Sequence, residues 1–92
     1  MKKTVICEKV LTLGGGEKCT LTYYLVAENC REDNAVFTRY GVGISIPEKN
    51  EDEFIRDLTA KEERAMRLLD LLASNFVTPV GLHDVLCDWI CT

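Results

Sequence analysis

Three side chains near the end of the chain have types and spacing that suit chemistry. His83, Cys87 and Cys91 follow one another at intervals of four residues, so an α-helix would align them along one stripe. Imidazole and thiolate groups are the ligands that zinc prefers. On a helix, however, the outer two would lie about 12 Å apart at ~1.5 Å per residue. A metal site would therefore use one neighbouring pair, with further ligands from a sheet cysteine or a second chain.

The preferred interpretation of these residues is that they bind no metal and no cofactor. Cys87 and Cys91 can simply flank a buried helical stripe, with His83 at its polar edge. His83 is the only histidine, so a nucleophilic pair would have to join it to Cys87, and no motif supplies an oxyanion hole or a third group. We therefore predict a protein that is not an enzyme, and keep the thiol or metal site as the alternative.

Composition excludes several classes of function. The chain has 92 residues and a net charge of -4, which disfavours a surface that neutralises nucleic-acid phosphates. No apolar run approaches the ~18 residues of a membrane span, and Glu8 and Lys9 interrupt the start before an export segment can form. The five cysteines are odd in number and lack a Cys-x-x-Cys motif, so we expect free thiols in a cytoplasmic protein.

Alternation of apolar and polar residues with a period of two predicts an antiparallel meander in the first half of the chain. The hairpin from Cys19 to Ile46 carries the cleanest alternation. The segment around Phe54 is too short for its periodicity to separate a strand from a helix. The predicted strands span residues 4–13, 19–28, 35–46 and, as a fourth short strand, 53–58.

A period of 3.6 residues predicts two helices in the second half, at residues 60–75 and 79–91. Thr59 and Glu62 have the spacing of a capping box for the first, and Thr78 is the expected cap of the second, with Pro79 in its first turn. The short connection makes the helices antiparallel neighbours. The predicted fold is thus a single α+β domain, residues 1–92, with both helices packed on one face of a three- to four-stranded meander.

The hairpin register is predicted by treating residues 29–34 as a polar connection. Ala27 then faces Val36, Tyr23 faces Tyr40, and Trp89 is expected to pack on this inner face. Two helices cannot cover both faces of the sheet, so the outer face should remain open as an interface. We expect it to bind a protein partner or a second copy of the chain through Tyr24, Val26, Phe37, Arg39, Gly41 and Gly43.

Two segments resemble a family of small bacterial proteins of unknown function. Residues 40–44 read Tyr-Gly-Val-Gly-Ile, and residues 77–90 read Val-Thr-Pro-Val-Gly-Leu-His-Asp-Val-Leu-Cys-Asp-Trp-Ile. They are similar to the family's Tyr-Gly-x-x-Ile strand and Val-x-Pro-x-x-Leu-x-Asp-Val helix. Asp57-Leu58-Thr59 is similar to the Asp-Leu/Ile-Ser/Thr helix start that lies between these two elements in the family. The resemblance implies one compact domain of bacterial origin. It implies no activity.

Overall fold

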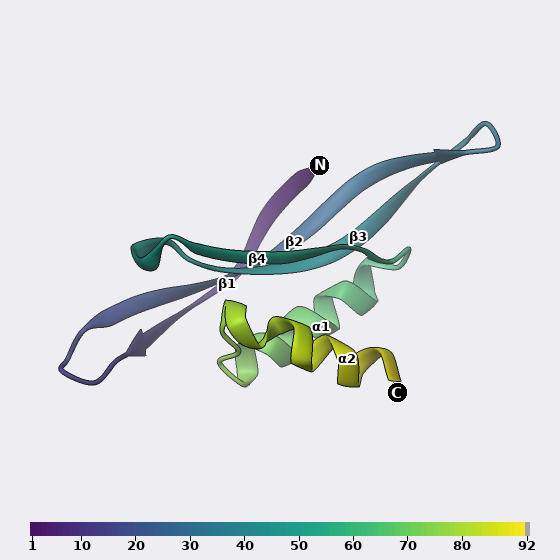
Figure 1. Ribbon diagram of the computed structural model, residues 1–92. Helices are drawn as coiled ribbons and strands as arrows, with labels where there is room; N and C mark the ends of the chain where they lie inside the picture. The colour runs from purple at the N-terminus through teal and green to yellow at the C-terminus, as the bar shows by residue number, and fades with distance from the viewer. Residues whose placement is uncertain (92) are drawn as a thin grey trace.

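The computed structural model describes the backbone of residues 1–91 and the side chains of residues 1–89. Within this range the chain forms four strands and then two helices (Figure 1). The elements are β1 (Lys2–Thr12), β2 (Lys18–Glu32), β3 (Ala35–Ile46), β4 (Glu51–Thr59), α1 (Glu62–Ser74) and α2 (Leu82–Cys91), with short 3₁₀ turns η1 (Pro47–Lys49) and η2 (Pro79–Gly81).

The strands form one antiparallel sheet in the order β1-β2-β3-β4. Both helices lie on the same side of this sheet (Figure 1). The predicted α+β meander is therefore confirmed. The segment around Phe54, which sequence periodicity left open, is the strand β4.

The core lies between the helices and the middle of the sheet. Because side chains alternate along a strand, β2 and β3 present one apolar set to the helices, and the apolar residues of α1 recur at the spacing of one helical face. α2 contributes Leu82 and Leu86, both buried. The buried cluster comprises Cys19, Leu21, Tyr23, Leu25, Val42, Ile44, Ile46, Ala65, Leu68, Leu69, Leu72, Ala73, Leu82 and Leu86.

Both predicted helix caps are wrong. Thr59 ends β4, and its hydroxyl accepts a hydrogen bond from the Lys61 amide at 3.1 Å. The residue before α1 is Lys61, which has no side-chain cap. Thr78 precedes the 3₁₀ turn η2, not α2, and its backbone carbonyl accepts the bond from the Gly81 amide at 3.0 Å. Neither threonine side chain therefore caps the helix for which the sequence predicts it.

The predicted register of the β2–β3 hairpin is also wrong. Tyr23 faces Ile44, and Ala27 faces Tyr40. The connection is only Asp33–Asn34, both with positive φ (50° and 66°), as a two-residue hairpin turn with the right twist requires. Each strand is consequently longer, and every partner differs from the prediction by four residues. Because four is an even number, the inner and outer sets stay as predicted.

A bulge explains why the first strand alternates poorly in the sequence. The pairing of β1 with β2 shifts between Val5 and Cys7, so Ile6 is an extra residue that reverses the alternation. Val5 pairs with Tyr24 on the outer face, whereas Cys7 pairs with Tyr23 on the inner face.

Two glycines in β3 allow close approaches that a side chain would block. A Cβ atom on Gly41 would lie 1.9 Å from the backbone oxygen of Ile55, and one on Gly43 would lie 2.2 Å from the ring of Tyr24. The first contact occurs where β4 bulges, since Tyr40 pairs with Thr59 but Val42 pairs with Ile55. Strand glycines often mark such contacts with backbone or a ring.

The sheet is much longer than the helices that cover it. At ~3.3 Å per residue, the 15 residues of β2 extend about 50 Å, whereas the 13 residues of α1 extend about 20 Å at ~1.5 Å per residue. The molecule measures 55 × 27 × 17 Å. The β1–β2 and β2–β3 hairpins therefore project beyond the helices at opposite ends (Figure 1).

Candidate binding site: a groove between the two helices

Two of the three residues of the alternative metal site lie on the surface of α2. His83 and Cys87 are exposed, and His83 Nε2 is 3.9 Å from a carboxylate oxygen of Glu53. The side chain of Cys91 lies outside the described residues. Among the side chains of residues 1–89, no group of three His, Cys, Asp or Glu residues is arranged to hold a metal ion. Cys7, Cys19, Cys30 and Cys87 are free thiols.

The predicted outer-face patch is partly covered by the chain itself. Tyr24 is only 5% exposed and Val26 only 1%, so the prediction that both lie open is wrong. The Tyr24 hydroxyl donates a hydrogen bond to Asp52. The Lys3 ammonium lies 4.4 Å from the ring centroid of Phe54 and 5.4 Å from that of Tyr24. Side chains from both edge strands therefore converge over the middle of this face.

The other predicted interface residues do not join Tyr24 and Val26 in one open surface. The register places Phe37 opposite Cys30, on the projecting β2–β3 hairpin. Arg39 pairs with the carboxylate of Asp57 in the β4 bulge. Gly41 and Gly43 are covered by the backbone of β4 and by a tyrosine ring. Binding of a partner at these six residues stays a prediction.

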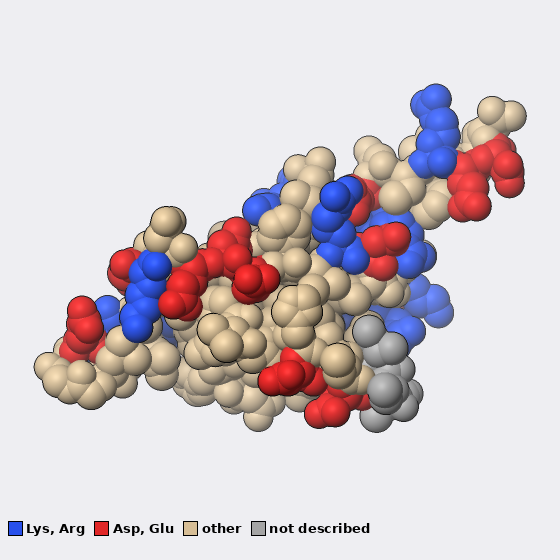
Figure 2. Space-filling view, viewed as in Figure 1, with Lys and Arg blue, Asp and Glu red and all other residues tan. Residues whose placement is uncertain are grey.

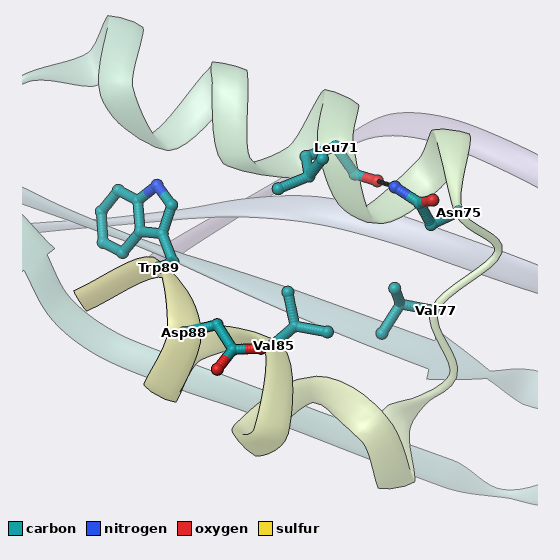
Figure 3. Close-up of a pocket in the computed structure, with 6 residues that line it drawn as sticks. All are labelled: Leu71, Asn75, Val77, Val85, Asp88 and Trp89. Atoms are coloured by element: carbon teal, nitrogen blue, oxygen red, sulfur yellow. Dashed lines mark hydrogen bonds between the residues drawn. The ribbon is translucent and has the colours of Figure 1, made fainter. Parts of the chain in front are cut away.

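A groove of about 320 Å³ opens between α1 and α2. In Figure 3 the labelled side chains of both helices and of their connection surround one space. Four of them are apolar, and two are polar. The lining residues are Leu71, Asn75, Val77, Val85, Asp88 and Trp89.

The groove exists because each helix uses one stripe for the core and keeps a second apolar edge beside it. In α1, Leu68, Leu69 and Leu72 are buried, while Leu71 remains 46% exposed. In α2, Leu82 and Leu86 are buried, while Val85 and Trp89 are half-buried. These secondary edges face the space between the helices (Figure 3).

Trp89 is only half-buried, whereas the sequence predicts a core position on the inner face of the hairpin. It packs at the margin of the core and lines the groove. The guanidinium carbon of Arg64 lies 5.0 Å from its ring centroid, a distance typical of a cation–π contact. Truncating Trp89 should consequently cost less stability than full burial would imply, because the residue is only partly buried.

Tyr23 fixes the connection that closes one end of the groove. Its ring is fully buried in the sheet, and its hydroxyl donates a 2.9 Å hydrogen bond to the carbonyl oxygen of Val77. Burial, with a smaller contribution from nearby Cys7, raises the pKa of Tyr23 to about 12. The groove residue Val77 is thus held by a neutral phenol from β2.

We expect the stabilising effect of the Tyr23 hydroxyl to diminish in alkali. At pH 8, Tyr23→Phe should lower the free energy of unfolding by about 1 kcal/mol, the usual value of one hydrogen bond. Above pH 10 the unfolded tyrosine ionises, while the folded one stays protonated until about pH 12. The wild type should therefore lose stability over this window, and its advantage over Tyr23→Phe should narrow. Urea denaturation at pH 8 and pH 11 measures both; an unchanged difference would contradict the assignment.

Comparison with protein families gives one match. A model described as a family of unknown function (DUF6514) matches residues 2–92. The chain belongs to this family. The match confirms the resemblance to a family of unknown function, and it assigns no activity to the DUF6514 fold. No curated protein and no solved structure matches the chain.

Neither helix of the described DUF6514 chain is long and apolar enough to cross a bilayer.

The sequence contains a signal for the groove that periodicity alone does not use. Val85 and Trp89 fit the apolar stripe of the last helix, which is why they are expected in the core. Leu71 is different, because it lies between Asp70 and the buried Leu72 and does not belong to the core-facing stripe of its helix. A single exposed leucine is ordinary, but Leu71 shares the groove lining with Val85 and Trp89, and contiguous apolar surface marks interaction sites.

Proposed function

We propose that the chain is a non-catalytic protein-interaction module of the bacterial cytoplasm, and that it binds a partner protein in the groove between α1 and α2. The single observation that supports this most is the apolar lining of an open groove: Leu71, Val77, Val85 and Trp89 surround it. Such surfaces on small proteins are common sites of protein–protein contact.

The composition of the groove suits anchoring of side chains from a partner. Its volume of about 320 Å³ is near the lower end of binding pockets, which span ~300–1,000 Å³, and so admits a few apolar side chains. Trp89 supplies the residue type most enriched among energetically dominant interface positions. The groove walls are helices anchored on the sheet by buried leucines, so the site is formed before a partner arrives.

Other binding modes have less support. Self-association through the outer face of the sheet would rely on Tyr24 and Val26, which are already buried within one chain. Nucleic-acid binding is disfavoured by the net charge of -4. A catalytic role has no arrangement of nucleophile, base and orienting group to support it among the described side chains.

We expect Leu71→Asp to abolish partner binding without unfolding the chain. Leu71 is 46% exposed, so an aspartate there can stay hydrated while it places a charge in the apolar groove. The test is a selection against the purified chain from a displayed library of fragments of its own organism's proteome. Fragments that bind should lose at least tenfold in affinity for Leu71→Asp, measured by surface plasmon resonance.

Val36→Asp is the matched control, because Val36 is also an exposed apolar residue but lies on the β2–β3 hairpin away from the helices. Circular dichroism of both variants checks that the fold is intact. Selected fragments that bind wild type and Leu71→Asp equally well, or that lose affinity for Val36→Asp instead, would place the binding surface elsewhere and refute the proposal.

A further inference from the structure

The α2 side of the groove carries a negative charge that forms no ion pair among the described side chains. Asp88 lines the groove and lies in the last turn of α2. The carbonyl end of a helix is already negative, so a carboxylate there is unfavourable, and this turn contains no basic residue. Within the described part of the chain, Asp88 takes part in none of the ion pairs.

A second carboxylate strengthens the negative potential. Asp84 lies one helical turn before Asp88, is exposed, and likewise has no ion pair within the described residues. Like charges spaced four residues apart on a helix repel each other modestly. Figure 2 shows acidic side chains over α2, with no basic ones directly beside them in that view.

The remaining polar group of the groove also favours a partner that donates hydrogen bonds. Asn75 uses its amide nitrogen to bond the carbonyl oxygen of Leu71 at 2.8 Å (Figure 3). Its side-chain oxygen therefore remains an acceptor, like the carboxylate of Asp88. The guanidinium of Arg64 is positioned against the indole ring of Trp89. Both polar residues that line the groove, Asn75 and Asp88, thus present acceptor oxygens beside its apolar side chains.

The groove walls determine what kind of segment can enter. Both walls are α-helices, whose backbone groups are hydrogen-bonded within each helix, so they offer no free edge to which a partner could add a strand. Recognition has to proceed through side chains. An amphipathic helix meets this requirement, because its residues at i, i+3, i+4 and i+7 project apolar anchors from one face.

We infer that the partner segment is a basic amphipathic helix of another protein. Its apolar face would contact Leu71, Val85 and Trp89, and lysine or arginine residues beside that face would pair with Asp88 and Asp84. This inference rests on the proposed function and adds the chemical class of the partner. The charge complementarity between an acidic rim and a basic helix is what distinguishes this occupant from a second copy of the chain, whose own α2 carries the same two carboxylates.

The intrinsic fluorescence of the chain provides a direct test, since Trp89 is its only tryptophan and lines the groove. The probe is a synthetic helical peptide without aromatic residues, with leucine at i, i+3, i+4 and i+7 and lysine at the flanking positions. Titration should change the Trp89 emission saturably. Asp88→Asn should weaken binding about two- to fivefold, as expected for loss of one exposed ion pair, and added salt should reduce this difference.

Asp70→Asn is the matched control, because it removes the same charge from an exposed position of α1 outside the groove lining. It should leave the affinity unchanged. An equal loss for both variants would mean that only the net charge matters, and would overturn the inference.

A second peptide, with every lysine replaced by glutamine, separates the inference from the proposed function. If it binds the wild type as tightly as the basic peptide, the groove binds helices without regard to charge, and only the inference is wrong. If neither peptide changes the emission of Trp89 at millimolar concentration, both the inference and a helix-binding groove are refuted. If light scattering shows a dimer, and the emission of Trp89 changes when that dimer dissociates on dilution, the occupant is a second copy of the chain. That result would refute the basic helix.

Discussion

Gly41→Ala is expected to lower the free energy of unfolding by about 3 kcal/mol, the upper end of the usual cost of overpacking. The added Cβ would lie 1.9 Å from the backbone oxygen of Ile55. No side-chain rotation relieves this clash, because the β3 backbone fixes the position of the Cβ and the oxygen belongs to the β4 backbone. Relief would require β4 to move away from β3, which breaks the pairing around the bulge. Urea denaturation followed by circular dichroism measures the effect.

Gly14→Ala is the appropriate control. Gly14 has open space within 4 Å of an added Cβ and does not adopt a positive φ, so alanine should be neutral or slightly stabilising through the unfolded state. A Gly41→Ala variant as stable as Gly14→Ala would show that β4 does not press against β3 at Gly41, and the bulge described here would be wrong.

Leu82→Ala is expected to cost about 3 kcal/mol, within the ~2–5 kcal/mol found for buried leucines. Leu82 is fully buried and begins α2, and only Leu86 accompanies it in the core among the described side chains of that helix. Small domains have only about 5–15 kcal/mol of stability in total, so a large share of it depends on this one side chain. The midpoint of thermal unfolding should fall clearly.

Val80→Ala provides the comparison, because Val80 is nearby but 81% exposed. Surface substitutions of this kind usually change stability by less than ~0.5 kcal/mol. Equal effects of the two variants would contradict the docking of α2 through Leu82. A further measurement, the emission of Trp89, should report whether the groove opens when Leu82 is truncated.

The fold class was predictable because the strand and helix periodicities of the sequence both agree with it. Period-two alternation in Cys19–Ile46 and period-3.6 stripes after Ala60 both direct one apolar face to a shared core. The hairpin partners were not predictable in the same way. Periodicity is unchanged by an even shift, so it fixes the face of Tyr23 but cannot distinguish Tyr40 from Ile44 as its partner. Only the Asp33–Asn34 turn contains that information.

The candidate site was less accessible to sequence reasoning than the fold. The sequence pattern of a helix is the same whether an apolar residue at the side of its stripe lines a groove or enters the core. Periodicity therefore predicts a core position for both Val85 and Trp89. Whether these residues line a groove depends on how far α1 lies from α2. That separation depends on the connection at Val77, whose carbonyl oxygen accepts a hydrogen bond from Tyr23. That contact joins residues 54 positions apart in the chain, and no local pattern encodes it.

The unequal lengths of sheet and helices divide the molecule into regions of different local stability. Residues 31–36 of the β2–β3 hairpin are all exposed, and an isolated pair of strands is marginally stable at best in water. Opening this tip breaks backbone hydrogen bonds but uncovers none of the apolar core. Its amides should therefore exchange with solvent through small local fluctuations, whereas those of β2 beneath the helices need global unfolding. The same strand thus contains both persistent and transient backbone, and a protease should cut the exposed Asp33–Asn34 turn before it cuts β2 beneath the helices.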